Sequence, residues 1–307
     1  MITSTQAFDL QAGTVNAILA GTNGLTKSTV GVVSLNFANP NLAGTATISG
    51  GDLILALTGS LSANTPVTFT GTGNLIANAT MVLGALTSTG GFGTVQMGSN
   101  ALTVTSATDT SFSGVISGSS TLTKEGTGAQ TLTGINTYAG PTTVNAGKLI
   151  LASTGTGTTI KAPVTVNNGG TLRVDTSTAV DATFPITVAS GGLFEIKADA
   201  TIGSLVGAGN AQLNSSTLTT GSLGSTDFSG KIDGTLSGKL VKVGSTTFTL
   251  SGTQENTFGN AEVQGGTLVL NKTTGVNAIG GGTTSILTGA TLSLSVSNQI
   301  SDSGTVS

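Results

Sequence analysis

The sequence predicts an all-β fold in which short strands stack as the successive coils of a β-solenoid. Three observations lead to this prediction. Apolar and polar residues alternate between turn residues along the chain, no stretch of ten or more residues has helical periodicity, and one long stretch recurs in three places. Alternation bounded by Gly and Asn is typical of strands and turns, and internal recurrence is typical of repeat architectures.

The composition indicates a folded chain with an almost uncharged surface. Charged residues make up 7% of the 307 residues, against roughly 25% in an average soluble domain. Hydrophobic residues make up 37%, and 47 residues are glycine. Disordered chains are usually highly charged and poor in β-branched residues. We therefore expect a packed fold whose surface is built mainly from hydroxyl and amide groups.

Charge and hydropathy exclude several classes of partner. The net charge is −3 and no basic run is present, so we expect no nucleic-acid binding. No apolar run approaches the ~20 residues of a membrane helix, so we expect no membrane insertion by this segment.

The opening residues MITSTQAFDL lack the features of a signal peptide. The absence of cysteine excludes disulfides and thiol chemistry.

The recurring stretch occupies residues 12–56, 109–152 and 225–271. Each copy has a lysine that follows a Leu-x or Leu-Val pair: Lys27, Lys124 and Lys242. Eight residues later comes a leucine that we expect to point into the core at equivalent positions: Leu35, Leu132 and Leu250. Other apolar positions also correspond between copies: Leu53, Leu149 and Leu268; Leu42, Tyr138 and Phe258; Phe112 and Phe228. The stretch is therefore a repeat rather than a local hairpin.

The segments between the copies share one pattern, which PVTVNNGGTLRVD, PITVASGGLFEIK and TSILTGATLSLSV illustrate. A short alternating strand is followed by a turn with Gly or Asn, and then by a second strand. Gly and Asn supply the positive φ angles that tight corners need. The five prolines lie at corner-like positions, such as Pro40 and Pro141.

Many short strands can also build a sandwich or a barrel, but the repeats favour a solenoid. A repeating unit of this kind buries its apolar face only by stacking on a copy of itself. With about 20 residues per coil, residues 1–307 would form a single continuous solenoid of roughly fifteen coils.

Residues 122–151 resemble a known family, the autotransporter-associated β-strand repeat, also called the passenger-associated transport repeat. The family pattern runs G-L-T-K, T-L-T-L-x-G, N-T-Y-x-G and T-T-V-N-x-G-x-L. Residues 201–234 resemble the segment that usually precedes such a repeat, and the first copy has NPNLAG in place of N-T-Y-x-G. The resemblance implies a right-handed parallel β-helix, similar to an autotransporter passenger and exported to the surface of a Gram-negative-type cell.

The residues needed for common catalytic chemistries are missing. Without His or Cys, serine and cysteine triads and the usual zinc sites are excluded. The glycines of GGFGTVQMG (residues 90–98) are not followed by a helical pattern, so we interpret them as corner residues. The tandem motif of calcium-binding β-rolls is absent. We therefore predict no catalytic, cofactor-binding or metal site, and no cofactor.

One group of charged residues merits comparison with β-helix enzymes that act on polysaccharides. Such enzymes need clustered carboxylates, so that one can be protonated while another is charged. The best candidates are Glu195 and Asp199 with Lys197, and Arg173 and Asp175 behind them. We expect these residues to form a solvated, ion-paired face of adjacent coils.

Threonine pairs are frequent, and regular threonine arrays on a solenoid can bind ice. The pairs include Thr68/Thr70, Thr103/Thr105, Thr121/Thr123 and Thr131/Thr133. Because their spacing along the chain is irregular, we do not expect one face to collect them. Threonine also suits outward strand positions in general. The glycosylation sequons at Asn78, Asn214 and Asn271 are expected by chance in this composition.

The sequence thus predicts a non-enzymatic structural β-solenoid at the cell surface or outside the cell, associated with the outer membrane. It would serve as a stalk, an adhesin shaft or a fibre. The alternatives are a polysaccharide-active β-helix enzyme, which needs converging carboxylates, and a carbohydrate-binding adhesin for host or surface glycans, which needs a row of exposed aromatics.

Both ends of the chain have the pattern of mid-solenoid strands, as AFDLQAGTV and ATLSLSVSNQISDSGTVS show. An open terminal coil exposes unpaired backbone groups above an apolar core. We therefore expect the solenoid to continue past these ends, by covalent extension or by self-association. Head-to-tail stacking would give a filament, and local caps are the alternative.

Overall fold

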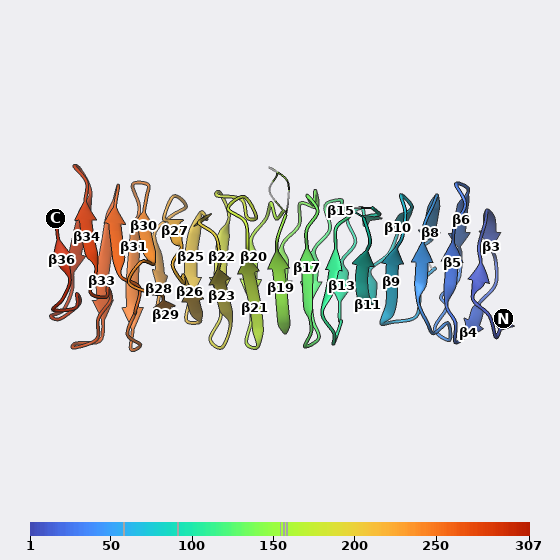
Figure 1. Cartoon of the computed structure of the whole chain (residues 1–307), viewed down its shortest axis with the longest axis horizontal. Coiled ribbons are helices and arrows are strands. Elements are labelled where there is room, and N and C mark those ends of the chain that lie inside the picture. The colour runs from blue at the N-terminus through green and yellow to red at the C-terminus, as the bar shows by residue number, and fades with distance from the viewer. Residues whose placement is uncertain (58, 91, 154, 156, 158) are drawn as a thin grey trace. The chain divides into compact units, whose positions relative to one another are not determined.

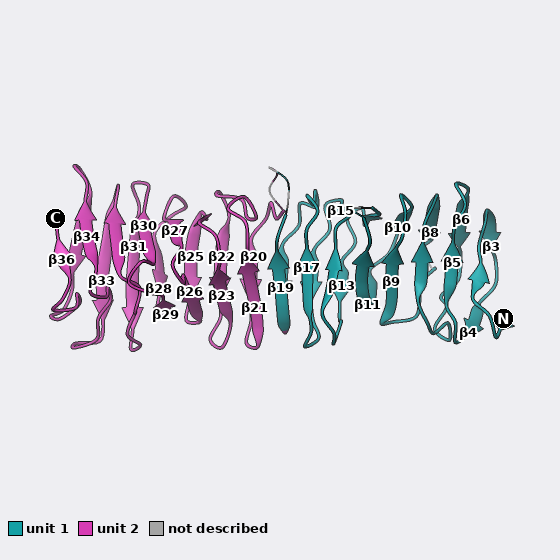
Figure 2. Ribbon diagram, viewed as in Figure 1, with its two compact units in different colours: residues 1–143, 147–155 teal, residues 144–146, 156–307 magenta. Residues whose placement is uncertain are grey.

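The computed structural model describes residues 1–57, 59–90, 92–153, 155, 157 and 159–307, and these residues form parallel strands without a helix. They make about 14 turns of a β-solenoid, which confirms the predicted fold class (Figure 1). The chain divides into two compact units (Figure 2). The first unit comprises residues 1–143 and 147–155, and the second comprises residues 144–146 and 156–307.

The first unit contains several parallel sheets, in which each strand is hydrogen-bonded to the one named after it. One sheet runs through β2 (Phe8–Asp9), β5 (Leu25–Lys27), β7 (Ala46–Ile48), β9 (Thr65–Phe69), β11 (Met81–Ser88), β13 (Leu102–Val104) and β16 (Leu122–Lys124). A second runs through β3 (Gly13–Val15), β6 (Val32–Leu35), β8 (Asp52–Leu55), β10 (Asn74–Ala77), β12 (Thr94–Gln96) and β15 (Val115–Ser117). The others are β14 (Thr110–Phe112), β17 (Ala129–Leu132) and β19 (Gly147–Leu151), and the pair β1 (Ile2–Ser4) and β4 (Leu19–Gly21). Strand β18 (Thr142–Val144) has residues in both units.

The second unit is built in the same way. One sheet runs through β20 (Val164–Val166), β22 (Pro185–Val188), β25 (Ser204–Gly207), β28 (Thr226–Phe228), β31 (Thr247–Gly252), β33 (Thr267–Lys272) and β35 (Thr291–Leu294). A second runs through β21 (Gly170–Val174), β23 (Leu193–Ile196), β26 (Asn210–Gln212) and β29 (Lys231–Asp233). A third runs through β24 (Ala200–Thr201), β27 (Thr217–Thr220), β30 (Lys239–Lys242), β32 (Asn260–Val263), β34 (Thr283–Ile286) and β36 (Thr305–Val306).

Ladders of apolar side chains fill the interior of each unit, because in-register pairing places like residues above one another. In the first unit, five buried side chains from successive coils form one ladder: Val33, Leu53, Leu75, Val95 and Ile116. In the second unit, four buried side chains form another: Leu172, Phe194, Ala211 and Ile232. Stacked apolar rows of this kind are the main stabilising term in a solenoid.

The three leucines that were expected to point inward are buried: Leu35, Leu132 and Leu250. Leu35 and Leu132 nevertheless belong to different sheets of the first unit, β6 in one and β17 in the other. The lysine strands β5 and β16 share one sheet, but its register shifts at β11. Strand β11 pairs with β9 through Leu83–Ser88 and with β13 through Met81–Leu83. The expected equivalence of Leu35 and Leu132 is therefore wrong, because the ladder moves along the coil between the two copies.

Each copy has a glycine at the same corner, where its last apolar strand begins. Gly51, Gly147 and Gly266 all have a φ of 61°. A Cβ atom on Gly266 would lie 2.3 Å from the carbonyl oxygen of Thr246 in the preceding coil. The corner therefore needs glycine both for its backbone conformation and for the close approach of the neighbouring coil. Among the described residues, no helix has the length and hydropathy needed to cross a membrane.

Candidate functional site

The repeat lysines are buried, which the sequence pattern did not predict. Lys27, Lys124 and Lys242 are 0%, 1% and 0% exposed, and a further lysine, Lys272, is 1% exposed. Lysine is almost never fully buried unless its charge has partners. The strands that carry these residues each end at the lysine, so the side chain enters the interior just before a corner.

The partners of the buried ammonium groups are backbone carbonyl oxygens at stacked corners. Lys242 Nζ donates to the carbonyls of Val243 at 2.7 Å and Gly244 at 3.1 Å in its own corner. It also donates to the carbonyl of Gly265 at 3.1 Å, in the next coil. The ammonium group thus uses all three of its donors and connects two coils.

Lys27 and Lys124 make the same kind of contact in the first unit. Lys27 Nζ donates to the carbonyl of Thr29 in its own corner and to that of Gly50 in the next coil, at 3.1 Å for Gly50. Lys124 Nζ donates to the carbonyls of Glu125 and Gly126, at 2.9 Å for Gly126. The repeat therefore places an ammonium group beneath a corner in each of its three copies.

The side chain of Lys272 bonds to earlier coils, whereas those of Lys27 and Lys242 bond to the next coil. Its Nζ donates to the carbonyl of Ser251 at 2.8 Å and to that of Gly230 at 2.8 Å. Ser251 lies one coil earlier and Gly230 two coils earlier. The backbone N–H of Lys272 donates to Oε1 of the buried Gln299 at 2.7 Å. Lys272 therefore links its own coil to two earlier coils through its side chain and to a later coil through its backbone N–H.

Burial lowers the pKa of all four lysines, because an ammonium group loses its hydration inside the protein. The pKa of Lys124 falls to about 8, although Asp109 and Glu125 oppose the fall. The pKa of Lys272 also falls to about 8, and Asp227 opposes it. An amine this deeply buried is closed to a substrate. The arrangement favours a structural role over that of a nucleophile or general base.

A buried asparagine completes each copy. Asn39, Asn136 and Asn256 are at most 1% exposed. Their Oδ1 atoms accept hydrogen bonds from the backbone N–H groups of Leu19, Ile116 and Ile232, at 2.7, 2.8 and 2.7 Å. Each bond satisfies a backbone donor of the preceding coil that the sheets leave unpaired.

Two or three residues after this asparagine come the corresponding residues Leu42, Tyr138 and Phe258, and all three are buried. The Tyr138 hydroxyl and the Thr142 hydroxyl form a hydrogen bond of 2.7 Å. Burial raises the pKa of Tyr138 well above its usual range. Its hydroxyl therefore serves packing and hydrogen bonding rather than proton transfer.

The charged group around Glu195 contains two ion pairs, as expected, but Glu195 itself is buried rather than solvated. Arg173 Nε lies 2.6 Å from Asp175 Oδ1, and Lys197 Nζ lies 3.0 Å from Glu195 Oε1. Arg173 and Glu195 are also register partners on β21 and β23. Asp199 lies apart and accepts the backbone N–H of Thr217 at 2.8 Å. Among the described residues, no three acidic, His or Cys side chains are close enough to hold a metal ion.

The expectation that no face collects the threonines is wrong for the first unit. Thr26, Thr47, Thr68 and Thr87 are direct register partners on β5, β7, β9 and β11. The hydroxyls of Thr68 and Thr87 lie 2.8 Å apart. Thr103 and Thr123 are likewise paired. The coils differ in length, which makes the spacing along the chain irregular, but parallel pairing aligns the residues nonetheless.

A second hydroxyl row follows the first, two residues further along the chain and one residue past the end of each strand. It consists of Ser28, Ser49, Thr70 and Thr89. Backbone bonds extend the ladder to this row, because the N–H groups of Ser49, Thr70 and Thr89 donate to Lys27, Ile48 and Phe69. In a strand, residues i and i+2 lie on the same side, so the two rows share the outer face.

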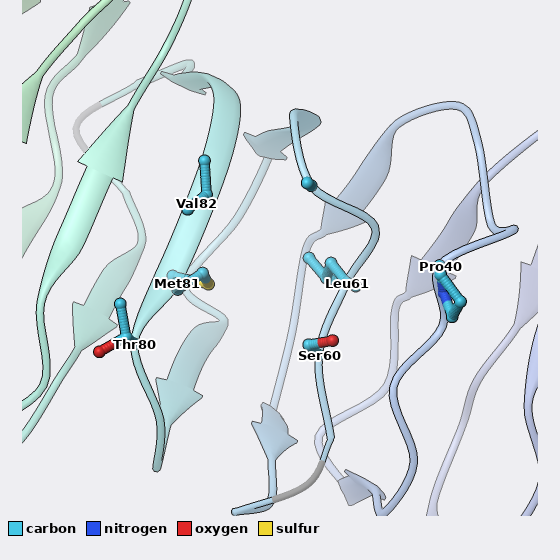
Figure 3. Close-up of a pocket in the computed structure, with 7 residues that line it drawn as sticks. Pro40, Ser60, Leu61, Thr80, Met81 and Val82 are labelled. Carbon is cyan, nitrogen blue, oxygen red and sulfur yellow. The ribbon is translucent and has the colours of Figure 1, made fainter.

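A pocket of about 240 Å³ lies in the first unit (Figure 3). Its lining combines apolar groups with two hydroxyls: Pro40, Ser60, Leu61, Ala63, Thr80, Met81 and Val82. None of these side chains is ionisable, so the pocket offers no acid or base.

The glycine-rich residues 90–98 contain strand β12 rather than the start of a helix, and residue 91 lies outside the described part of the chain.

Comparison with known proteins identifies the repeat. The family described as the passenger-associated-transport-repeat matches residues 122–151 and 240–270, which lie in the second and third copies. No curated protein and no solved structure matches the chain. The matched segments contain the buried lysine and asparagine of each copy, with Tyr138 in one and Phe258 in the other. The chain therefore carries two passenger-associated transport repeats.

Proposed function

We propose that this chain is a non-enzymatic structural solenoid that acts outside the cell, as a stalk, an adhesin shaft or a fibre. The repeats and the solenoid fold fit an autotransporter passenger-like structural domain. The observation that carries the proposal is that the polar side chains of the repeat bind the protein's own backbone and leave none of their groups for a substrate. Its lysines and asparagines bind backbone groups of stacked coils and face away from solvent.

The location is part of this proposal. The repeat family implies a cell-surface or secreted protein, and a surface of hydroxyls and amides stays hydrated without many charges. An antibody against the chain should label intact cells of its source, and protease added outside those cells should remove the signal. Labelling that requires permeabilised cells would contradict an extracellular role.

We also propose that a further coil pairs with the outermost coils, supplied by more of the same polypeptide or by a second copy. Leu250 and Leu270 are 0% exposed, but their ladder partner Leu294 on β35 is 51% exposed. On β1, Ile2 is 51% exposed, whereas its partner Leu19 on β4 is 2% exposed. Covering these apolar edges would bury both side chains and pair the open strands.

The association can be tested with the purified chain, in which only a second copy can supply the extra coil. We expect its mass in solution to rise with concentration and electron micrographs to show end-to-end assemblies. Leu294→Lys should abolish this association, since it places a charge in the interface. Thr187→Lys serves as the control, because Thr187 lies on β22, far along the chain from either end. A mass that stays monomeric at every concentration would refute the self-association.

A second candidate function is binding to a neutral glycan through the two hydroxyl rows of the first unit. The rows run over four successive coils, and residues 53–108 contain no charged residue. A regular, uncharged array of hydroxyls suits a partner that is itself a repeating array of hydroxyls.

Sedimentation with insoluble cellulose or chitin tests this candidate. The chain should pellet with one of these polysaccharides, and the double variant Thr47→Lys/Thr68→Lys should remain in the supernatant. Thr187→Lys in the second unit should pellet like the wild type. Equal pelleting of the double variant, or no pelleting of the wild type, would eliminate the hydroxyl rows as a glycan site.

A further inference from the structure

The hydrogen bonds of two buried lysines span overlapping segments of the second unit, residues 242–265 for Lys242 and residues 230–272 for Lys272. Lys242 Nζ joins its own corner to Gly265 in the following coil. Lys272 Nζ joins its strand to Ser251 and Gly230 in the two preceding coils. Residues 230–272 are therefore held by hydrogen bonds that run forward from one lysine and backward from the other.

Opening any coil within this segment breaks bonds to a charged group. If the coil with Gly265 moves away from Lys242, the ammonium group keeps only the carbonyls of its own corner. If the coil with Ser251 moves, Lys272 loses a partner in the same way. Hydrogen bonds to charged groups are the stronger ones, and a buried charge that loses its partners is strongly destabilising. Partial opening of the segment is thus less favourable than opening all of it.

We propose that the buried lysines are latches that make residues 230–272 a single unit of local opening. This segment contains the whole of the matched repeat at 240–270. Solenoids otherwise open coil by coil, since each coil contacts only its neighbours. The latches of the third copy would suppress such fraying, and Lys27 would act in the same way on its own coils of the first unit.

Reaction of the native chain with an amine-acylating reagent, read by mass spectrometry, tests the proposal. A buried lysine reacts only from an open state, so its rate reports the open population when closing is fast. Lys161 and Lys197 are exposed and provide references within the same chain. Lys242 and Lys272 should react far more slowly than these references, and with one shared rate and one shared dependence on denaturant. Different denaturant dependences for the two lysines would overturn the proposal.

Substitution at one latch should be detected at the other. In Lys242→Met, Lys272 should react roughly 10- to 100-fold faster, which corresponds to the loss of hydrogen bonds to a charged group. Lys27, in the first unit, should keep its wild-type rate. Lys242→Arg should not restore protection, because the planar guanidinium cannot meet carbonyls arranged around a tetrahedral nitrogen. Lys161→Met is the matched control.

An unchanged rate at Lys272 in the Lys242→Met variant would refute the latch, and so would an equal acceleration at Lys27. If Lys242→Met does not fold, the comparison of Lys242 with Lys272 in the wild-type chain still decides the question. The test is independent of the extracellular role, because it measures only opening of the folded chain.

Discussion

The buried lysines show how single polar residues hold stacked coils together. Each ammonium group lies under a corner where several carbonyl oxygens converge from one or two coils. Its burial is costly, and the carbonyls offset that cost by replacing water as hydrogen-bond acceptors. The same balance makes the stability of the fold sensitive to pH.

The free energy of unfolding should rise as the pH increases from about 8 towards 10. The pKa of Lys124 and of Lys272 is about 8 in the folded chain, below the ordinary lysine value of 10.5. Above pH 8 the unfolded chain therefore binds more protons than the folded chain, and stability increases with pH. Above about pH 10.5 the trend should reverse, because the unfolded lysines have then lost most of their protons, while the raised pKa of Tyr138 means that the unfolded chain loses its phenolic proton first.

Urea unfolding at several pH values between 7.5 and 10 measures this effect. The variants Lys124→Met and Lys272→Met should each have a flatter pH dependence than the wild type, and Lys161→Met should match the wild type. A wild-type stability that falls steadily between pH 8 and 9.5 would contradict the expected protonation states.

The repeat asparagine supports a second prediction at this scale. Asn256→Ala should lower the free energy of unfolding by roughly 1–3 kcal/mol, because it leaves the buried N–H of Ile232 without an acceptor. It also removes the bond to the carbonyl of Ala278. The exposed Asn271 provides the control, since Asn271→Ala should change little. Equal urea midpoints for the two variants would argue against a structural role for Asn256.

At the scale of the element, corners need glycine for two separate reasons, the backbone conformation and the close approach of a neighbouring coil. Gly266 and Gly289 both have positive φ angles, 61° and 85°, but only Gly266 faces a neighbouring coil at close range. Gly289→Ala should cost about 1–2 kcal/mol for the backbone conformation alone. Gly266→Ala should cost more, because its Cβ would lie 2.3 Å from the carbonyl oxygen of Thr246. Urea unfolding compares the two, and an equal loss would mean that close coil contact does not constrain the corner.

Truncation within a strand should have a local effect. Leu132→Ala should cost about 2–5 kcal/mol, as truncations of buried leucines do. Since each coil contacts only its neighbours, hydrogen exchange should accelerate first in β14, β17 and β19, which pair around this residue. Protection in β5 and β7, further along the first unit, should persist. Uniform loss of protection over all of these strands would indicate a globally cooperative unit instead.

At the scale of the whole molecule, no three acidic side chains of the described residues lie close enough to hold a metal ion, and four acidic side chains have cationic partners. Asp175 and Glu195 each have a cationic neighbour, and Asp233 and Glu262 have Lys231 and Lys239. Incubation with pectin or alginate should therefore release neither reducing ends nor unsaturated products. Activity that disappears in Glu195→Gln or Asp199→Asn would overturn the non-enzymatic proposal, whereas activity that survives both substitutions would indicate a contaminating enzyme.

The class of fold and the repeat could both be predicted from the amino-acid sequence. Alternating apolar residues specify which side of a strand is buried, and corner glycines specify where a strand ends, because both are local properties of the chain. This is why the inward positions of Leu35, Leu132 and Leu250 could be predicted and are confirmed. The ion pairs of Arg173 and Glu195 followed from the same reasoning.

Which residues of different coils meet could not be predicted from the sequence and is seen only in the folded chain. The alignment of Thr26 with Thr47, Thr68 and Thr87 depends on the length of each coil, which is 47 − 26 = 21 and 68 − 47 = 21 residues for the first two steps but 87 − 68 = 19 for the third. The burial of Lys27 and Lys242 depends on carbonyl oxygens that a neighbouring coil brings to the corner. A lysine two residues before a glycine, such as Lys242 before Gly244, has the local pattern of an exposed turn. Its environment is set by contacts between residues more than 20 positions apart, and these contacts exist only once the coils have stacked.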